Sequence, residues 1–184
     1  DPPKSNSDLQ RDYVCITDQA AFQEWLKKIT TAKLTCIDTE TTSLDALQAQ
    51  LVGISLSVRA GEACYIPVAH RSGEEQLERG WVLEQLKPWL ENSTAKKVGQ
   101  NLKYDIHIFA NYQIRVQGVE HDTLLESYVL ESHLSHSMDS LAQRHLGIKT
   151  IQYEEVCGKG VHQIGFDQVD LKTATEYAAE DADI

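Results

Sequence analysis

Hydrophobic residues recur at every second position in the first part of the chain, which is the spacing of β-strands. The clearest case is residues 51–58, where Ile54, Leu56 and Val58 fall on one face and polar side chains fall on the other. A short glycine-containing turn follows, and residues 63–68 return as a second strand, so this segment predicts a β-hairpin. Further strands are expected at residues 13–17, 33–44 and 96–99.

Hydrophobic residues spaced three and four positions apart dominate the rest of the chain, and this spacing predicts amphipathic helices. In one example, Val82, Leu83, Leu86 and Trp89 form a single apolar stripe behind a polar loop. Because strands come first and helices follow, we expect an α/β domain in which helices flank a mixed sheet that includes the hairpin. The helices are expected at residues 18–28, 77–90, 101–112, 121–132, 138–147, 151–158 and 170–184.

The two ends of the chain differ from its middle. Residues 1–10 are polar, contain two prolines and are predicted to be a linker or N-terminal extension. Residues 11–184 then form the domain. The last predicted helix reaches Ile184 without a capping glycine, so we expect the sequence to be a fragment of a longer polypeptide, truncated within that helix.

Length and composition fit one globular domain, with 184 residues, 41% hydrophobic and 24% charged. No apolar run is long enough to cross a bilayer and no signal peptide opens the chain, so no membrane partner is expected. The formal net charge of −11 argues against a basic nucleic-acid-binding surface. It does not exclude a nuclease, because carboxylates that bind cations are counted here as bare negative charge.

The four cysteines indicate a reducing environment. Cys15, Cys36, Cys64 and Cys157 form no C-x-x-C pair. Three of them lie in apolar strand-like segments, where free cysteine behaves as a small buried hydrophobic residue. We therefore expect no disulfide framework and a cytoplasmic location.

The seven histidines do not indicate a metal site. His121, His133 and His136 are close in sequence, but no partner cysteines and no H-E-x-x-H spacing accompany them. We expect them to be surface histidines.

The first candidate site lies in the predicted strand at residues 33–44, KLTCIDTETTSL. Side chains alternate between the faces of a strand, so Cys36, Asp38 and Glu40 point the same way. Two carboxylates that continue an apolar row are unfavourable unless their negative charge is balanced, and divalent cations would balance it. This pair therefore predicts a metal site that other acids complete.

Two later segments offer further acids. Asp105 follows a strand and a glycine turn, where ligands collect in open α/β sheets, but the position also suits an acid that only complements the helix dipole. In the last helix Tyr177 and Asp181 share a face, whereas Asp183 lies about 200° and Glu180 about 100° round the helix from Asp181. Taken alone, such an acidic helix is more often a solvent-exposed face.

Three motifs taken together change this interpretation. They are DTET at residues 38–41, VGQNLKYD at 98–105 and YAAEDAD at 177–183. With the flanking segments CYIPVAH, LLESYVL, MDSLA and EEVCGKG, the chain resembles the 3′→5′ proofreading exonuclease domain of bacterial DNA polymerase I, the small domain of the Klenow fragment. The resemblance covers most of the chain. It implies a ribonuclease H-like fold, the tyrosine-containing (DEDDy) exonuclease subclass and a bacterial, nucleoid-associated protein.

The resemblance also implies roles for five residues. Asp38, Glu40, Asp105 and Asp181 would bind two divalent ions, and hard oxygen ligands suit Mg²⁺ or Mn²⁺, with Zn²⁺ as an option at one position. Asp38 would bridge both ions. Glu40 and Asp181 would complete the coordination of the ion that activates the nucleophile, and Asp105 would hold the second ion through water. Tyr177, whose ordinary pKa is about 10, would stay protonated and orient the attacking water.

The implied substrate is a single-stranded or frayed DNA 3′ end, delivered by the polymerase domain of the same longer chain. Leu44 and Tyr153 match positions of an apolar wedge that separates the last bases, although ordinary packing explains both equally well. Further sugar or phosphate contacts are predicted at Thr41, Gln100, Asn101 and Tyr104.

Two other functions remain open at this point. Ribonuclease D-like exoribonucleases share the same five-residue pattern, and the acids do not reveal whether the substrate is DNA or RNA; the polymerase-like flanking segments favour DNA. A non-catalytic module that only packs against a polymerase domain is the third possibility. Retention of all five residues argues against it.

Overall fold

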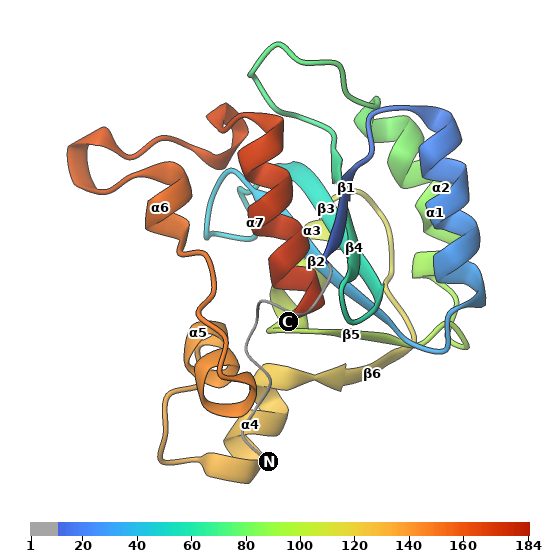
Figure 1. Cartoon of the computed structure of the whole chain (residues 1–184). Coiled ribbons are helices and arrows are strands. Elements are labelled where there is room, and N and C mark those ends of the chain that lie inside the picture. The colour runs from blue at the N-terminus through green and yellow to red at the C-terminus, as the bar shows by residue number, and fades with distance from the viewer. Residues whose placement is uncertain (1–10) are drawn as a thin grey trace.

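The computed structural model describes residues 11–184, and the predicted linker at residues 1–10 lies outside the described residues. The strands of the described part are β1 (Asp12–Cys15), β2 (Thr35–Thr41), β3 (Leu51–Arg59), β4 (Glu62–Pro67), β5 (Lys97–Gly99) and β6 (Val119–Asp122). Within residues 11–184 they form one six-stranded sheet in the order β1-β4-β3-β2-β5-β6 (Figure 1). β3 runs antiparallel to both neighbours and the other adjacent strands are parallel, so the sheet is mixed as predicted.

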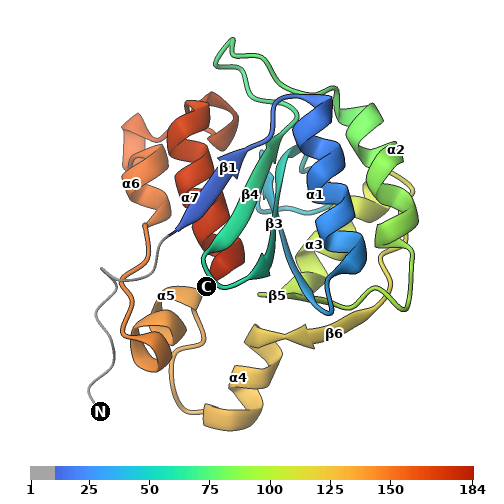
Figure 2. The ribbon, with the colours of Figure 1, turned by 45° about the vertical axis from the view of Figure 1, so that its right-hand side comes forward.

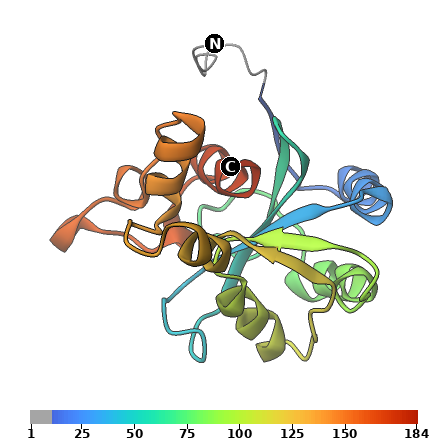
Figure 3. The ribbon, with the colours of Figure 1, turned by 90° about the horizontal axis from the view of Figure 1, so that it is seen from below.

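Helices cover both faces of this sheet. The regular helices are α1 (Gln19–Thr31), α2 (Arg79–Leu90), α3 (Leu102–Asn111), α4 (Thr123–Glu131), α5 (Met138–Leu141), α6 (Tyr153–Cys157) and α7 (Leu171–Asp183). As Figures 2 and 3 show, α1, α2 and α3 lie on one side of the strands and α7 lies on the other. The α/β architecture with flanking helices is therefore confirmed.

Each side of the sheet has its own hydrophobic core. The larger core joins the sheet to α1, α2 and α3 and includes the fully buried Phe22, Ile37 and Phe109. The smaller core lies under α7 and includes Tyr65 and Phe166. Successive side chains of β2 therefore point to opposite faces of the sheet. Ile37 lies in the larger core, whereas Cys36 and Asp38 point to the face that α7 covers.

The predicted hairpin is present as β3 and β4, but its polar face is not exposed to solvent. Ser55 and Ser57 are buried because α7 packs across this face of the sheet. Gly53 on the same strand makes room for the ring of Tyr65, since a Cβ at Gly53 would lie 2.2 Å from the ring carbon Cζ. Alternation of polar and apolar residues therefore predicted the strand correctly, but it did not indicate that α7 buries the polar face.

The chain from residue 119 to 169 differs most from the sequence-based expectation. A helix was expected at residues 121–132, but the strand β6 occupies the start of that range and pairs in parallel with β5. The helix α4 begins only at Thr123, and Asp122 caps it. β6 is short and exposed, so it carries no hydrophobic alternation that could reveal it. The expected helix at 138–147 divides into α5 and a π-helical turn, η2 (Ala142–Leu146). Two unpredicted 3₁₀ turns follow, η3 (Gly160–His162) and η4 (Phe166–Gln168).

None of the helices described in residues 11–184 is both long and apolar enough to span a bilayer. The four cysteines are free thiols. Cys64 is buried, as expected for a cysteine in a strand, and so is Cys157, whereas Cys15 and Cys36 are only half-buried.

Candidate active site

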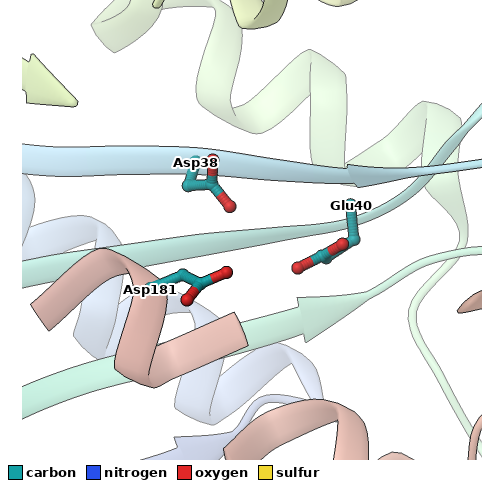
Figure 4. Close-up of side chains that lie close together, drawn as sticks. All are labelled: Asp38, Glu40 and Asp181. Carbon is teal, nitrogen blue, oxygen red and sulfur yellow. The ribbon is translucent and has the colours of Figure 1, made fainter. Parts of the chain in front are cut away.

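Three of the predicted acids lie together between β2 and α7. Asp38 and Glu40 project from β2 and meet Asp181, which comes from the last turn of α7 (Figure 4). One carboxylate oxygen from each residue lies within 4.8 Å of the other two. The sequence places Asp181 more than 140 residues from Asp38, so only the packing of α7 on the sheet unites them.

Small side chains on α7 allow this close approach. Ala174, Ala178 and Ala179 are fully buried against the sheet, and the helix contacts β1, β2, β3 and β4. The predicted geometry of the last helix is also correct, since Asp183 faces away from the cluster. Its carboxylate accepts hydrogen bonds from the Tyr13 hydroxyl and the Gly61 backbone N–H, both at 2.7 Å.

Asp105 lies outside this group of three. It is only 3% exposed in the first turn of α3, and its carboxylate accepts a hydrogen bond of 2.5 Å from the Thr39 hydroxyl on β2. Thr39 is flanked by Asp38 and Glu40, and Asp105 is near enough to raise the pKa of Glu40 by charge repulsion. The structure therefore brings all four predicted acids to β2 but gathers only three around one point.

The acids carry negative charge that the protein itself leaves uncompensated. Among residues 11–184, none of the ion pairs includes Asp38, Glu40 or Asp181. Burial raises the pKa of Asp38 to about 7. Burial, and then repulsion from Asp38, raises the pKa of Glu40, Asp105 and Asp181 well above the usual range. Such a site is unstable in its ionised form without added positive charge.

A bound divalent cation fits the donor set. Converging carboxylate oxygens are hard ligands that suit Mg²⁺ or Mn²⁺. Beside the cluster, Ser55 is directly opposite Asp38 in the β2–β3 register, and its buried hydroxyl has no hydrogen-bond partner within the described chain. A buried hydroxyl without a partner is unfavourable, and solvent or a ligand held by Asp38 would satisfy it.

Tyr177 lies one helical turn before Asp181, as predicted. The pKa of its phenol is raised far above the ordinary value by burial first, and then by the negative charge of Asp181. The phenol is therefore protonated at neutral pH. It can donate a hydrogen bond at the edge of the acid cluster but cannot act as a base there.

The predicted wedge residues lie at the surface. Leu44 is 96% exposed in the loop between β2 and β3, which excludes ordinary core packing for this side chain. Tyr153 is 39% exposed at the start of α6, and its ring packs against Phe166 and Tyr177. An exposed leucine and a half-exposed aromatic ring are both available to a ligand.

Three of the four predicted sugar or phosphate contacts have hydrogen-bond partners within the described chain. The hydroxyl groups of Thr41 and Tyr104 are hydrogen bonded to each other, and both reach the Ser43 carbonyl, which fixes the base of the Leu44 loop. The Gln100 amide donates to the His136 carbonyl at 3.0 Å and accepts from Thr123. Asn101 is exposed and adopts a left-handed backbone conformation with φ of 60°. Their contact with a substrate stays a prediction.

His136 is not the surface residue that the sequence suggested, and a further histidine, His70, is buried as well. His70 is buried, with Nε2 2.8 Å from the Tyr65 hydroxyl and Nδ1 3.0 Å from the Val169 carbonyl. His136 is half-buried and stacks on Tyr128, and its Nδ1 lies 2.8 Å from the Ser127 hydroxyl. Both are held by local packing that the sequence spacing does not reveal. Neither belongs to a metal-binding group among residues 11–184.

Glu180 is a functional neighbour that the sequence did not identify. A solvent-exposed acidic helix was one expectation, but Glu180 is 2% exposed, accepts a hydrogen bond of 2.6 Å from the Ile151 N–H and pairs with Arg11. These contacts hold the turn of α7 that carries Asp181. The partners are 29 and 169 residues away, so no local pattern could reveal them.

We expect Glu180→Gln to lower the free energy of unfolding by about 1–3 kcal/mol, because a charged hydrogen-bonding partner of Arg11 is lost. Chemical denaturation measures this change. Glu176→Gln, on the exposed face of the same helix, is the matched control and should change stability by less than about 0.5 kcal/mol. Equal effects for the two variants would contradict the structural role of Glu180.

The fold is similar to that of solved nucleases. Escherichia coli RNase D is similar over 94% of this chain and 42% of that chain, with a TM-score of 0.65 and 16% identity. Brucella melitensis NrnC with bound Mg²⁺ is similar over 83% of this chain and 68% of that chain, with a TM-score of 0.59 and 17% identity. The fold is that of the ribonuclease H-like exonuclease domains.

Sequence comparison then gives the family. Residues 13–184 match the family model described as 3′-5′ exonuclease, and the chain belongs to this family. DNA polymerase I of Pseudomonas aeruginosa is 52% identical over 178 residues, which are 94% of this chain and 20% of that protein. DNA polymerase I of Rhizobium leguminosarum is 38% identical over 192 residues, 94% of this chain and 19% of that protein. The chain thus spans about a fifth of the length of these curated relatives.

Proposed function

We propose that this domain removes nucleotides from single-stranded or frayed DNA 3′ ends by two-metal-ion phosphodiester hydrolysis. The observation that carries the proposal is the convergence of Asp38, Glu40 and Asp181 within 4.8 Å, without any compensating cationic side chain in the described part of the chain. Buried, like-charged carboxylates with raised pKa values are typical of catalytic sites. Membership of the 3′-5′ exonuclease family supports the direction of attack.

Each acid then has a defined task. Mg²⁺ or Mn²⁺, with Zn²⁺ as an option at one position, would neutralise the phosphate and favour a hydroxide nucleophile when bound. Asp38 would hold both ions, with Glu40 and Asp181 as further ligands of the first. Asp105, outside the group of three, would act on the second ion through water. Tyr177 would donate its phenolic hydrogen to the attacking water and so fix its line of approach.

The strand end is oriented by residues around the acid cluster. Leu44 and Tyr153 offer exposed apolar surface against which the last bases would stack. Thr41, Gln100, Asn101 and Tyr104 would contact sugar or phosphate. None of these side chains reads base identity, which suits an editing enzyme that must remove any mispaired nucleotide.

The relatives suggest the wider setting. Because both are DNA polymerase I, we propose that residues 11–184 act as one proofreading domain beside a polymerase domain that delivers the strand end. A bacterial cytoplasm, with association to the nucleoid, is the corresponding location. These properties belong to a longer protein than the one described.

A direct assay tests the proposed activity. The purified chain is incubated with Mg²⁺ or Mn²⁺ and a 5′-labelled DNA duplex that carries a single-stranded 3′ tail. We expect stepwise shortening and release of mononucleotides, and no shortening in excess EDTA. A duplex with a blocked 3′ end is the matched control substrate. Cleavage that persists in EDTA would contradict the two-metal mechanism.

RNA hydrolysis is the second candidate, because the fold is also similar to that of RNase D. A matched RNA oligonucleotide in the same assay distinguishes the two substrates. We expect faster hydrolysis of DNA, and a higher kcat/KM on RNA would assign the domain to the exoribonucleases. Loss of activity on both substrates, together with no Mn²⁺ binding by calorimetry, would favour the non-catalytic module.

A further inference from the structure

The ring of Tyr177 and the half-exposed ring of Tyr153 both pack against one buried aromatic residue. Phe166, in the 3₁₀ turn η4, is fully buried, and its ring centroid lies 5.8 Å from that of Tyr177 and 6.5 Å from that of Tyr153. The Tyr153 and Tyr177 rings are 6.2 Å apart at 72°. The three rings therefore form a mutually contacting triangle whose inner corner is Phe166.

The other side of Phe166 is fixed to the sheet. Its ring meets Tyr65 edge-on at 6.3 Å and lies 5.7 Å from the ring of His70. His70 is itself held by the Tyr65 hydroxyl and the Val169 carbonyl. Phe166 thus rests on a rigid, hydrogen-bonded layer and cannot move without disturbing it.

Tyr177 packs against the smaller core, and its aromatic neighbours there are Phe166 and Tyr153. It is half-buried on α7 one turn before Asp181, a carboxylate that metal binding would engage. An aromatic ring with two soft dihedral angles needs packing to hold its hydroxyl within a few tenths of an ångström. Phe166 and Tyr153 supply that packing, and only Phe166 is inaccessible to solvent and to substrate.

We propose that Phe166 is a positioning residue that sets the ring orientation of Tyr177, and so the placement of the attacking water. The inference rests on the proposed exonuclease function. Phe166 has no polar atom in its side chain and is fully buried, so its loss should slow the chemical step without weakening metal or strand binding. Tyr153 also packs against the ring of Phe166. A base stacked on Tyr153 would therefore push against the ring that supports the phenol of Tyr177.

The test replaces Phe166 by leucine, which keeps an apolar side chain and removes the ring. We expect Phe166→Leu to lower kcat about ten- to hundredfold, because small displacements of catalytic groups have effects of this size. KM should change by less than about threefold, and Mn²⁺ affinity should not change. Phe22→Leu is the matched control, since Phe22 is equally buried, contacts the ring of Trp81 at 5.0 Å and lies in the core on the opposite face of the sheet.

A spectroscopic measurement separates positioning from a loss of stability. The chain is labelled with 3-fluorotyrosine, and the Tyr177 signal in the ¹⁹F NMR spectrum is identified by its absence in Tyr177→Phe. Phe166→Leu should shift or broaden this signal, whereas Phe22→Leu should leave it unchanged even though both variants lower the melting temperature. A wild-type kcat or an unshifted Tyr177 signal in Phe166→Leu would overturn the proposal. If the wild-type chain hydrolyses no substrate, the proposed function fails, and the NMR spectra alone decide whether Phe166 orients Tyr177.

Discussion

Asp38→Asn is expected to lower the exonuclease rate by at least about a thousandfold while leaving the fold intact. Asp38 contributes to the repulsion that raises the pKa of Glu40, Asp105 and Asp181, and its carboxylate lies within 4.8 Å of those of Glu40 and Asp181. An amide is nearly the same size but carries no charge and is a poor bridging ligand. Single-turnover hydrolysis of a 3′-tailed oligonucleotide measures the change.

The same substitution should have the opposite effect on the stability of the metal-free protein. Removing one of several buried like charges relieves repulsion, so the melting temperature of Asp38→Asn in EDTA should equal or exceed that of the wild type. Asp12→Asn, an exposed aspartate on β1, is the control and should change neither property. A variant that loses activity because it unfolds would contradict this interpretation of Asp38.

The second large effect concerns metal binding and pH. Burial raises the pKa of Asp38 from 3.8 to about 7, so the native state binds protons that the unfolded state has already released. Between these two pKa values the metal-free native state loses stability as the pH rises, and the contribution of Asp38 to this loss is complete above about pH 7. Mn²⁺ would replace those protons. Its stabilising effect should therefore be small at pH 5 and large at pH 8.

At one hundred times its dissociation constant, a ligand that binds only the native state stabilises it by about 2.7 kcal/mol. For a domain of this size, that free energy raises the melting temperature by about 5–10 °C. Thermal unfolding with and without Mn²⁺ at pH 8 measures the shift, and Glu40→Gln should reduce it. A shift of the same size at pH 5 and pH 8 would argue that Mn²⁺ binds away from the buried acids.

Local patterns predicted the parts of the fold that local interactions determine. The β3–β4 hairpin follows from alternation around a tight turn, and α1 begins after Asp18, whose carboxylate caps the helix at the Ala21 N–H. β6 was missed because an exposed edge strand owes its structure to pairing with β5 rather than to its own side chains. The burial of Ser55 depends on α7, more than 110 residues later, and no local spacing conveys it.

The site residues also fall into those that local sequence patterns predict and those that depend on contacts between distant segments. Spacing alone identified the Asp38–Glu40 pair and the shared face of Tyr177 and Asp181. The position after a strand and a glycine turn indicated Asp105, and the resemblance then favoured a functional role for Asp105 and Asp181. The sequence did not predict that Asp105 would stand outside the close group, bonded to Thr39. Supporting residues such as Glu180 and Phe166 were not identified, because their role comes from contacts between distant segments.

The central claim is that Asp38, Glu40 and Asp181 bind divalent cations. Crystals of the chain soaked in Mn²⁺ test it most directly, because manganese gives an anomalous signal that identifies each ion without reference to the surrounding side chains. We expect one strong peak coordinated by oxygens of all three acids and a second within about 4 Å of it, on the side of Asp105. Crystals that hold Mn²⁺ elsewhere and show no anomalous peak among these three carboxylates would contradict the assignment.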